Sequence, residues 1–513
     1  MNVRSSAKLP KPLLTGGLLL LLAAMAMLVG AGGGLVGWFG QLFLLTVLVP
    51  GLLIALNYRF GLLALVLLMP FAGAQFVPRF GPLSIVNLLM LGVLSLMAVR
   101  LALKGMLQGT VVLPLPRQFL LLYLLPITIA YLIGSGHLNE IPPHLLDDDG
   151  ARTSLRSYWV SSYFKNVLFA LCGISVAVAV AEYRNPMTFV YTALASALLY
   201  VLATALMFAL TPQTLEAAVN SRQMYSATGR HANSVGAMLL AALAATLYMR
   251  DAASAWWGRM ALAGLALSLV AGVLLTGSRG AMLGLLVVVA IYLWQSRKLR
   301  TFLGVALIGT TVLMVAPSAV TDRLTMGLEE LTGKKDGELA RTGEQLTSGR
   351  LYLAKTLLPE VLKHPLFGNG TGSTRWSDYA KSGGPISHPH NLYILSLLDL
   401  GLIGSICVVA FVVYVIRLLR AMAREVALPP ILRAYFAGTL TGLIGFLALG
   451  VSQGTPFPNI DQWFLWIGFG IALGCQAMVK NSAQSDTLKT PADRATAPEY
   501  RSRAGAFWSG GSR

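Results

Sequence analysis

Apolar runs of about 20 residues recur along nearly the whole chain, and each is long enough to cross a bilayer as a helix. No soluble core could bury all of these runs, so the pattern excludes a soluble multi-domain enzyme. The composition agrees, because 56% of the 513 residues are hydrophobic and 12% are charged, whereas a soluble domain carries about 25% charged residues. We therefore expect an all-α polytopic membrane protein.

Hydropathy predicts fourteen spans, some of them short, at residues 13–29, 35–56, 61–77, 83–99, 119–133, 164–181, 187–210, 234–249, 260–275, 281–294, 302–315, 392–416, 435–451 and 463–478. If two of the first four spans form a re-entrant pair, the count is twelve, so the expected fold has 12–14 transmembrane helices. The predicted organisation is an N-terminal transmembrane bundle (1–317), a large outer loop with an amphipathic helix (318–389), C-terminal transmembrane helices (390–480) and a disordered tail (481–513).

The net charge of +18 comes from 39 Lys and Arg against 21 Asp and Glu. In a membrane protein such an excess is first explained by topology and anionic lipids, so we expect membrane lipids and no nucleic acid as partners. When loops alternate from a cytoplasmic start, most basic residues outside the long loop fall on the inner side. Both termini are therefore predicted in the cytoplasm, and the long loop in the periplasm of a bacterium.

No metal site is expected. The three cysteines each lie in an apolar run, where a thiol behaves as a small hydrophobic group. Asp147, Asp148 and Asp149 are the acidic cluster of the outer segments. Such a cluster is either solvated or holds a divalent ion, and we favour solvation.

A histidine at the end of the long loop is the main catalytic candidate. Pro389 restricts His388 to an extended conformation, which places His390 and Asn391 at the outer membrane boundary near the start of a helix. His390 could exchange a proton near neutral pH and act as a general base toward a sugar hydroxyl. The alternative is an interfacial histidine that only bonds to its neighbours. Asp399, about two turns deeper, is expected to have an Arg or His partner.

Four arginines map to the same face as His390. Arg222 and Arg230 precede a span, Arg279 lies in a glycine turn between two spans, and Arg350 falls in the first turn of a predicted loop helix. A cation in a first helical turn is unfavourable unless an anion lies nearby, and guanidinium groups suit phosphate oxygens. The alternatives are snorkelling for Arg279 and a solvated side chain for Arg350.

The long loop carries two further patterns. After Ser348 as a helix cap, an apolar stripe at helical spacing predicts a helix that lies on the membrane surface or on the bundle; its residues are Leu351, Ala354, Leu358, Val361 and Leu362. Gly368, Gly370 and Gly372 then form a glycine-rich turn that either presents amide groups to an anion or is purely structural.

Taken in order, these motifs resemble the O-antigen ligase and polymerase family. The resemblance runs from about Arg222 to Gly404, and the N-terminal spans match in hydropathy alone. The motifs are Arg222 to Asn233 (Arg-x6-Gly-x3-Asn), Ser278 to Ala281 (Ser-Arg-Gly-Ala), Ser348 to Arg350, Pro365 to Gly372, and His390 to Gly404 with Asp399 where many relatives have Glu.

The resemblance implies an inner-membrane glycosyltransferase, usually with twelve helices among the ligases. Its donor would be a glycan on undecaprenyl pyrophosphate and its acceptor the lipid A core, transferred at the periplasmic face without metal or cofactor. Family roles would make His390 catalytic and place Arg222, Arg279 and Arg350 on the donor pyrophosphate. His388, Asn391 and Arg230 are further substrate-binding candidates; the motif favours Arg222 over Arg230.

Three alternatives remain at this point. An O-antigen polymerase would use the same donor and residues. A protein-glycosylating relative would be expected to carry a further domain after the last span. A lipid or glycan transporter would explain the spans but not the gathering of arginines and His390 on one face.

Overall fold

The computed structural model describes residues 57–74, 77, 79–80, 83–108, 115–146, 154–210, 228–296 and 350–487. Its helices and helical turns, in chain order, are α3 (Tyr58–Leu68), η1 (Met69–Phe71), α4 (Ile85–Gln108), α5 (Arg117–Phe119), η2 (Leu120–Leu124), α6 (Leu125–Ser135), η3 (Leu138–Glu140), η4 (Pro143–Leu145), α7 (Leu155–Ser157), η6 (Tyr158–Phe164), α8 (Lys165–Tyr183), α9 (Pro186–Ala209), α11 (Ala232–Ala252), α12 (Trp256–Leu275), α13 (Arg279–Ser296), α18 (Arg350–Lys363), η8 (Ser373–Arg375), α19 (Asp378–Lys381), α20 (Leu392–Arg424), α21 (Pro430–Leu449), η9 (Ile460–Gln462) and α22 (Trp463–Thr487). Two short antiparallel strands, β1 (Arg79–Phe80) and β2 (Leu83–Ser84), pair Arg79 with Ser84.

Ten helices of the described part are long and apolar enough to span a membrane, which confirms the all-α polytopic prediction. They are Ile85–Leu103, Arg117–Ser135, Leu155–Tyr183, Pro186–Ala209, Ala232–Ala252, Trp256–Leu275, Arg279–Ser296, Leu392–Arg424, Pro430–Leu449 and Ile460–Ser482. The predicted spans 13–29, 35–56 and 302–315 lie outside the described residues. The predicted span 61–77 corresponds to a shorter apolar helix, Tyr58–Phe71.

Contacts divide the chain into two units, and the second contains everything discussed below. The first unit comprises Met1–Leu65 and Leu88–Val112, and in it the Arg100 guanidinium lies 4.8 Å from the ring centroid of Tyr58. The second unit comprises Val66–Asn87 and Leu113–Arg513.

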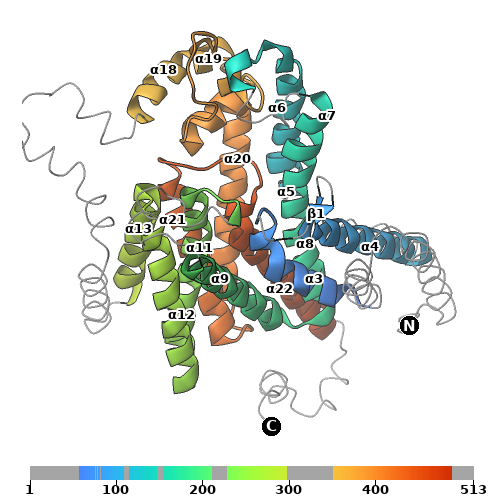
Figure 1. Ribbon diagram of the computed structural model, residues 1–513. Helices are drawn as coiled ribbons and strands as arrows, with labels where there is room; N and C mark the ends of the chain where they lie inside the picture. The colour runs from blue at the N-terminus through green and yellow to red at the C-terminus, as the bar shows by residue number, and fades with distance from the viewer. Residues whose placement is uncertain are drawn as a thin grey trace, which may run out of the picture. The chain divides into compact units, whose positions relative to one another are not determined.

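The alanine-rich helix α11 is the central helix of the second unit, with α12, α13 and α21 packed against it (Figure 1). Most of its residues are buried, and small side chains let the neighbouring backbones approach closely. A Cβ atom added at Gly442 of α21 would lie 2.8 Å from the Cα of Ala241. Because α12 ends where α11 and α13 begin, three helix termini are held at one end of this group.

The largest difference between a predicted and an observed span start is at the sixth predicted span. The span expected at 164–181 begins at Leu155, because α7, η6 and α8 form one continuous helix. The added turns are aromatic and pack on α6: the ring centroids of Tyr158 and Tyr163 lie 5.3 and 5.0 Å from that of Tyr131. This packing extends the helix into the segment between the predicted spans 119–133 and 164–181.

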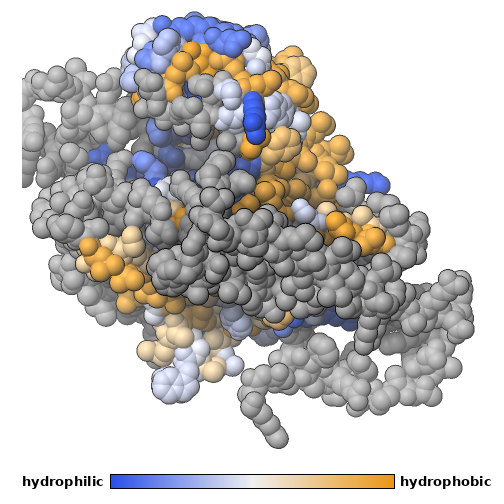
Figure 2. Space-filling model, turned by 45° about the vertical axis from the view of Figure 1, so that its right-hand side comes forward, coloured by the Kyte–Doolittle hydropathy of each residue, from blue (hydrophilic) through white to orange (hydrophobic). Residues whose placement is uncertain are grey.

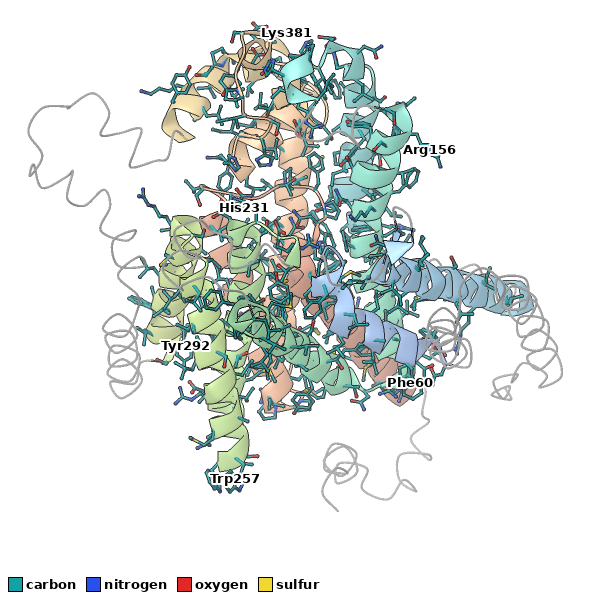
Figure 3. The ribbon with its side chains drawn as sticks, viewed as in Figure 1. Phe60, Arg156, His231, Trp257, Tyr292 and Lys381 are labelled. Carbon is teal, nitrogen blue, oxygen red and sulfur yellow. The ribbon has the colours of Figure 1, made fainter. Side chains whose placement is uncertain are left out.

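Two segments, 136–146 and 372–384, pack together into a structure that we call the cap. Its small core comprises Ile141, Leu145, Trp376 and Ala380. Lys381 donates a hydrogen bond to Glu140 across the two segments (2.8 Å). Figure 2 shows hydrophilic residues gathered at this end of the molecule, above a more apolar flank. Lys381 lies at this end in Figure 3, and the exposed, stacked pair Trp256 and Trp257 lies at the other.

Candidate functional site

The turn at 450–454, which follows α21, is where the start of α20 and the start of α11 meet. Gln453 Oε1 lies 2.9 Å from Nδ1 of His390, and the same oxygen accepts a hydrogen bond from Nδ2 of Asn233 (3.4 Å). Asn391 Nδ2 donates to the Val451 carbonyl (3.0 Å). The turn thus connects the predicted catalytic histidine to α11.

The start of α13 reaches the same turn. A Cβ atom added at Gly280 would overlap the side chain of Ser452, so the helix terminus packs directly on the 450–454 turn. Ser278 stabilises this terminus, because its Oγ accepts the backbone N–H of Ala281 (3.1 Å). Arg279 lies between these residues in sequence, so the structure places its backbone beside the turn that holds His390.

His390 has an uncommon backbone conformation for a residue with a side chain, with φ at 50°. Its N–H donates to Nδ1 of His388 (3.0 Å). The next residue, Asn391, is the N-cap of α20, and its Oδ1 accepts the N–H groups of Tyr393 and Ile394 (2.9 and 3.0 Å). The predicted position of His390 and Asn391 at the head of a helix is therefore correct. The amide of Asn391 has structural partners, and its contact with substrate stays a prediction.

A polar cavity of about 370 Å³ lies beside His388, between α6, the continuous helix α7–η6–α8, the glycine-rich turn and the segment 455–461; His390 and Arg279 are not among its lining residues. Its charged and titratable lining includes Lys165, Arg230, Arg375, His388, Asp399 and Asp461. The Nε atom of Arg230 is buried and makes no hydrogen bond in the structure. Burial lowers the pKa of the Arg230 guanidinium and the Asp461 carboxylate opposes that shift, although a guanidinium stays charged in proteins. The cavity is therefore suited to an anion.

The carboxylate of Asp399 is bound by the glycine-rich turn of the long loop. Its oxygens accept the N–H of Gly372 (3.2 Å), the N–H of Ser373 (3.2 Å) and the hydroxyl of Ser373 (2.5 Å). Backbone amides and a hydroxyl supply the hydrogen bonds of the buried carboxyl group, and Arg375 interacts with it electrostatically, as expected for an arginine partner. The amides of the glycine-rich turn thus bind a side chain of the protein itself, which agrees with the structural alternative for this turn.

Helix α20 is interrupted just after Asp399. At Gly401 the backbone has φ 64° and ψ −170°, a conformation that favours glycine. The N–H groups of the two following residues donate to the carbonyls of Pro365 and Leu366 (2.8 and 3.1 Å). The carbonyls of Leu398 and Asp399 accept N–H groups from the glycine-rich turn (2.7 and 3.2 Å). The long loop therefore supplies the backbone hydrogen bonds that the broken helix lacks.

The loop helix α18 has Arg350 in its first turn, as predicted, and packs on α20. Its buried face is Leu353, Leu357 and Val361, which join Leu398 in one apolar cluster. Leu358 and Leu362 of the predicted stripe are 54% and 74% exposed, so they do not pack on the bundle, and their contact with the membrane surface stays a prediction. The prediction of a helix from the apolar spacing is correct, but the face of α18 that packs on α20 differs from the predicted face.

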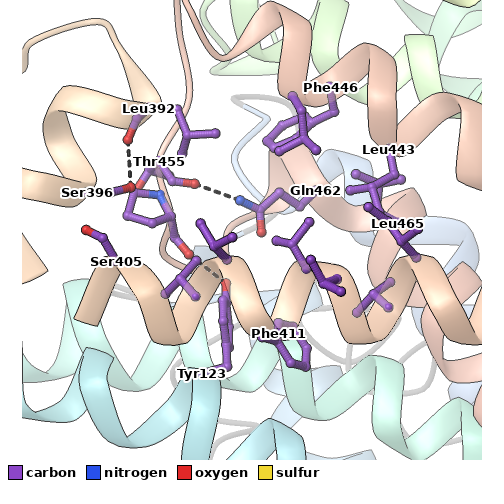
Figure 4. Close-up of a pocket in the computed structure, with 18 of the residues that line it drawn as sticks. Tyr123, Leu392, Ser396, Ser405, Phe411, Leu443, Phe446, Thr455, Gln462 and Leu465 are labelled. Atoms are coloured by element: carbon purple, nitrogen blue, oxygen red, sulfur yellow. Dashed lines mark hydrogen bonds between the residues drawn. The ribbon is translucent and has the colours of Figure 1, made fainter. Parts of the chain in front are cut away.

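An apolar groove of about 560 Å³ lies between α20, α21 and α22. Phe411, Leu443, Phe446 and Leu465 line it in Figure 4, and Gln462 donates a hydrogen bond to the Thr455 carbonyl at its edge (2.9 Å). Thr455 also lines the polar cavity, so the two spaces share a boundary residue.

The remaining sequence candidates have different outcomes. Arg222 and the cluster Asp147 to Asp149 lie outside the described residues, and so does the side chain of Arg350. Arg230 and His388 line the polar cavity. Within the described ranges, no group of three His, Cys, Asp or Glu is placed to hold a metal ion.

Sequence reasoning missed several residues of the site. Lys165, Arg375 and Asp461 line the polar cavity, and Gln453 contacts His390. The signal for Gln453 was weak: it lies in a short polar stretch between two spans, without spacing that links it to a histidine 63 residues earlier. Asn233 is the last residue of the motif from Arg222 to Asn233, but the sequence did not predict its contact with Gln453.

The fold and the site define a polytopic membrane protein with a cationic polar cavity, an adjoining apolar groove and a histidine held between helix ends. Residues 263–409 match the family model described as O-antigen ligase. This match covers part of the chain and supports the resemblance to the O-antigen ligase and polymerase family that the motifs indicated. A comparison with curated proteins finds no match.

Proposed function

We propose that this protein transfers O-antigen glycan from undecaprenyl pyrophosphate to the lipid A core oligosaccharide at the periplasmic face of the bacterial inner membrane. The observation that carries the proposal is the shared boundary at Thr455 between a cationic polar cavity and an apolar groove. A polyprenyl pyrophosphate has a long apolar chain joined to a dianionic head group. The two adjoining spaces match those two parts.

The polar cavity takes the pyrophosphate. Arg230, whose buried Nε has no hydrogen bond in the structure, is suited to a phosphate oxygen, and Lys165 and Arg375 add positive charge. Arg279 is proposed as a further donor contact, because its helix terminus packs beside the turn that holds His390. Arg222 and Arg350 keep that role as sequence-based proposals.

His390 acts as the general base. Its imidazole accepts the proton of an acceptor hydroxyl as the hydroxyl oxygen forms a bond to the anomeric carbon of the donor glycan. The bond between that carbon and the phosphate oxygen breaks, and undecaprenyl pyrophosphate leaves with its charge stabilised by the cationic side chains. A single displacement inverts the configuration at the anomeric carbon. The step requires neither metal nor cofactor.

The test is a reconstituted transfer reaction with purified donor and lipid A core, read by the mobility shift of the core band. His390→Ala is expected to abolish the shift, and His364→Ala, which removes an exposed histidine elsewhere in the loop, is expected to leave it intact. Normal transfer by the His390→Ala protein would remove His390 from the mechanism. Repeating the assay with chelator tests the proposed independence from metal.

A polymerase uses the same donor and would present the same site. The reaction distinguishes the two when the acceptor is varied: a ligase modifies the lipid A core, and a polymerase lengthens the lipid-linked glycan. A transporter would form no glycosidic bond with either acceptor.

A further inference from the structure

The imidazole of His390 is held by one side chain from the turn after α21. A neutral imidazole carries one N–H and one lone pair, and a general base needs the lone pair to face the reacting hydroxyl. Nδ1 of His390 lies 2.9 Å from Oε1 of Gln453. An amide oxygen only accepts hydrogen bonds, so this contact requires the proton on Nδ1.

Asn233 fixes which end of the Gln453 amide meets the histidine. Its Nδ2 donates to the same Oε1 atom from the other side (3.4 Å), and Asn233 is itself 4% exposed. Rotating the Gln453 amide by 180° would set its NH2 group against the NH2 group of Asn233, two donors facing each other. With the Asn233 amide as it lies in the structure, Gln453 is therefore oriented to accept from His390.

The backbone holds the ring in place. His390 has φ at 50°, its N–H donates to His388 Nδ1 (3.0 Å), and the next residue caps α20. Backbone strain of this kind persists where the surroundings over-determine it, which is typical of functional sites. Because His388 accepts at Nδ1, its own neutral form carries the proton on the other nitrogen, so the two histidines hold opposite tautomers.

We infer that Gln453, held by Asn233, is the positioning residue that fixes His390 in the tautomer with its lone pair on Nε2. The inference rests on the proposed function, in which that lone pair takes the acceptor proton. An uncharged amide suits this task, because a carboxylate at the same place would favour the protonated imidazolium and so weaken the base at neutral pH.

Two substitutions separate positioning from simple packing. Gln453→Leu removes the acceptor and is expected to lower the transfer rate about 10- to 100-fold with little change in the KM for donor. Gln453→Glu keeps an oxygen at Nδ1 and adds negative charge. We expect it to retain measurable transfer while the acidic limb of the pH–rate profile moves up by about one pH unit or more.

The control is Gln295→Glu, the same change on the opposite end of α13, where Gln295 bonds to Tyr248. Other charged or titratable groups around the turn are His388, His231 and Arg230 before α11, Arg279 on α13, and Asp461 before α22. They are common to every variant, so a shift confined to Gln453→Glu reports residue 453.

A second readout does not use activity. In full-length protein labelled with 15N-histidine in nanodiscs, the His390 signal, identified by its loss in His390→Ala, should show the Nδ1–H tautomer at neutral pH. Gln453→Leu should redistribute it toward the Nε2–H form. A wild-type Nε2–H signal, or a Gln453→Glu pH profile that coincides with wild type, would overturn the inference. If His390→Ala transfers normally, the proposed function fails, whichever tautomer is seen.

Discussion

The break in α20 at Gly401 makes a quantitative prediction. A Cβ atom added there would lie 2.3 Å from the backbone nitrogen of Gly368 and 2.5 Å from the carbonyl oxygen of Leu366. The loop and the helix must therefore separate in Gly401→Ala. The matched control is Gly383→Ala, since Gly383 also has a positive φ (94°) but no atom within 4 Å of an added Cβ.

We expect the two variants to lose different amounts of unfolding free energy. Both place alanine at a positive φ, but only Gly401→Ala also disturbs hydrogen bonds between the loop and α20. A positive φ costs alanine about 1–2 kcal/mol, which applies to both variants. Separation at Gly401 also weakens up to four loop–helix hydrogen bonds, each worth about 1 kcal/mol net. We expect Gly401→Ala to lose about 3–6 kcal/mol of unfolding free energy and Gly383→Ala about 1–2 kcal/mol.

The assay is reversible unfolding of the purified protein in mixed micelles with increasing SDS, followed by tryptophan fluorescence. Glycan transfer measured on the same samples should be lost in Gly401→Ala, because the displaced turn binds Asp399 at the wall of the polar cavity. If the two variants are equally stable, the hydrogen bonds between loop and helix contribute nothing and the reasoning is refuted.

Three further outcomes are expected. Arg230→Lys keeps the charge but loses the planar fork, so the KM for donor should rise about tenfold, and an unchanged KM would contradict the phosphate contact. Asp399→Asn removes one acceptor from the glycine-rich turn and should cost about 1–3 kcal/mol of unfolding free energy, read by SDS titration. Hydrogen bonds from Lys381 and His137 lower the pKa of Glu140, so its stabilising contribution is present above about pH 4.3 and is lost as the pH falls through the lowered pKa. Thermal melts of Glu140→Gln and wild type should therefore differ at pH 7 and converge once the pH lies below the lowered pKa of Glu140.

Much of the fold follows from hydropathy, because span length and apolarity are local properties. The ten long helices confirm that reading. The kink at Gly401 was not predicted, since glycine is common in membrane helices and hydropathy alone does not show where a helix breaks. The face of α18 that packs on α20 was also not predicted, because apolar periodicity indicates a helix but does not show which element it packs against.

Some residues of the site could be predicted from the sequence and others could not. His390 at the head of a helix was predictable, because Pro389 and the apolar run after Asn391 fix where that helix begins. The hydrogen-bond partners of Asp399 were not, since the turn that binds it lies 26 residues earlier and offers backbone amides, which every sequence has. Gln453 could not be predicted either, since nothing in the sequence links a single glutamine between two spans to the imidazole of His390.

The shared hydrogen bonding of the glycine-rich turn and the broken helix has a practical consequence for engineering. The stretch from Pro365 to Gly404 behaves as one inseparable module, half of it loop and half of it membrane helix. A chimaera could carry the long loop of a related protein and end the exchanged segment at the start of α20. The new loop would then meet the original helix at Gly401, where the backbone hydrogen bonds between loop and helix would no longer match. Exchange of acceptor or donor preference between relatives should therefore move both halves together.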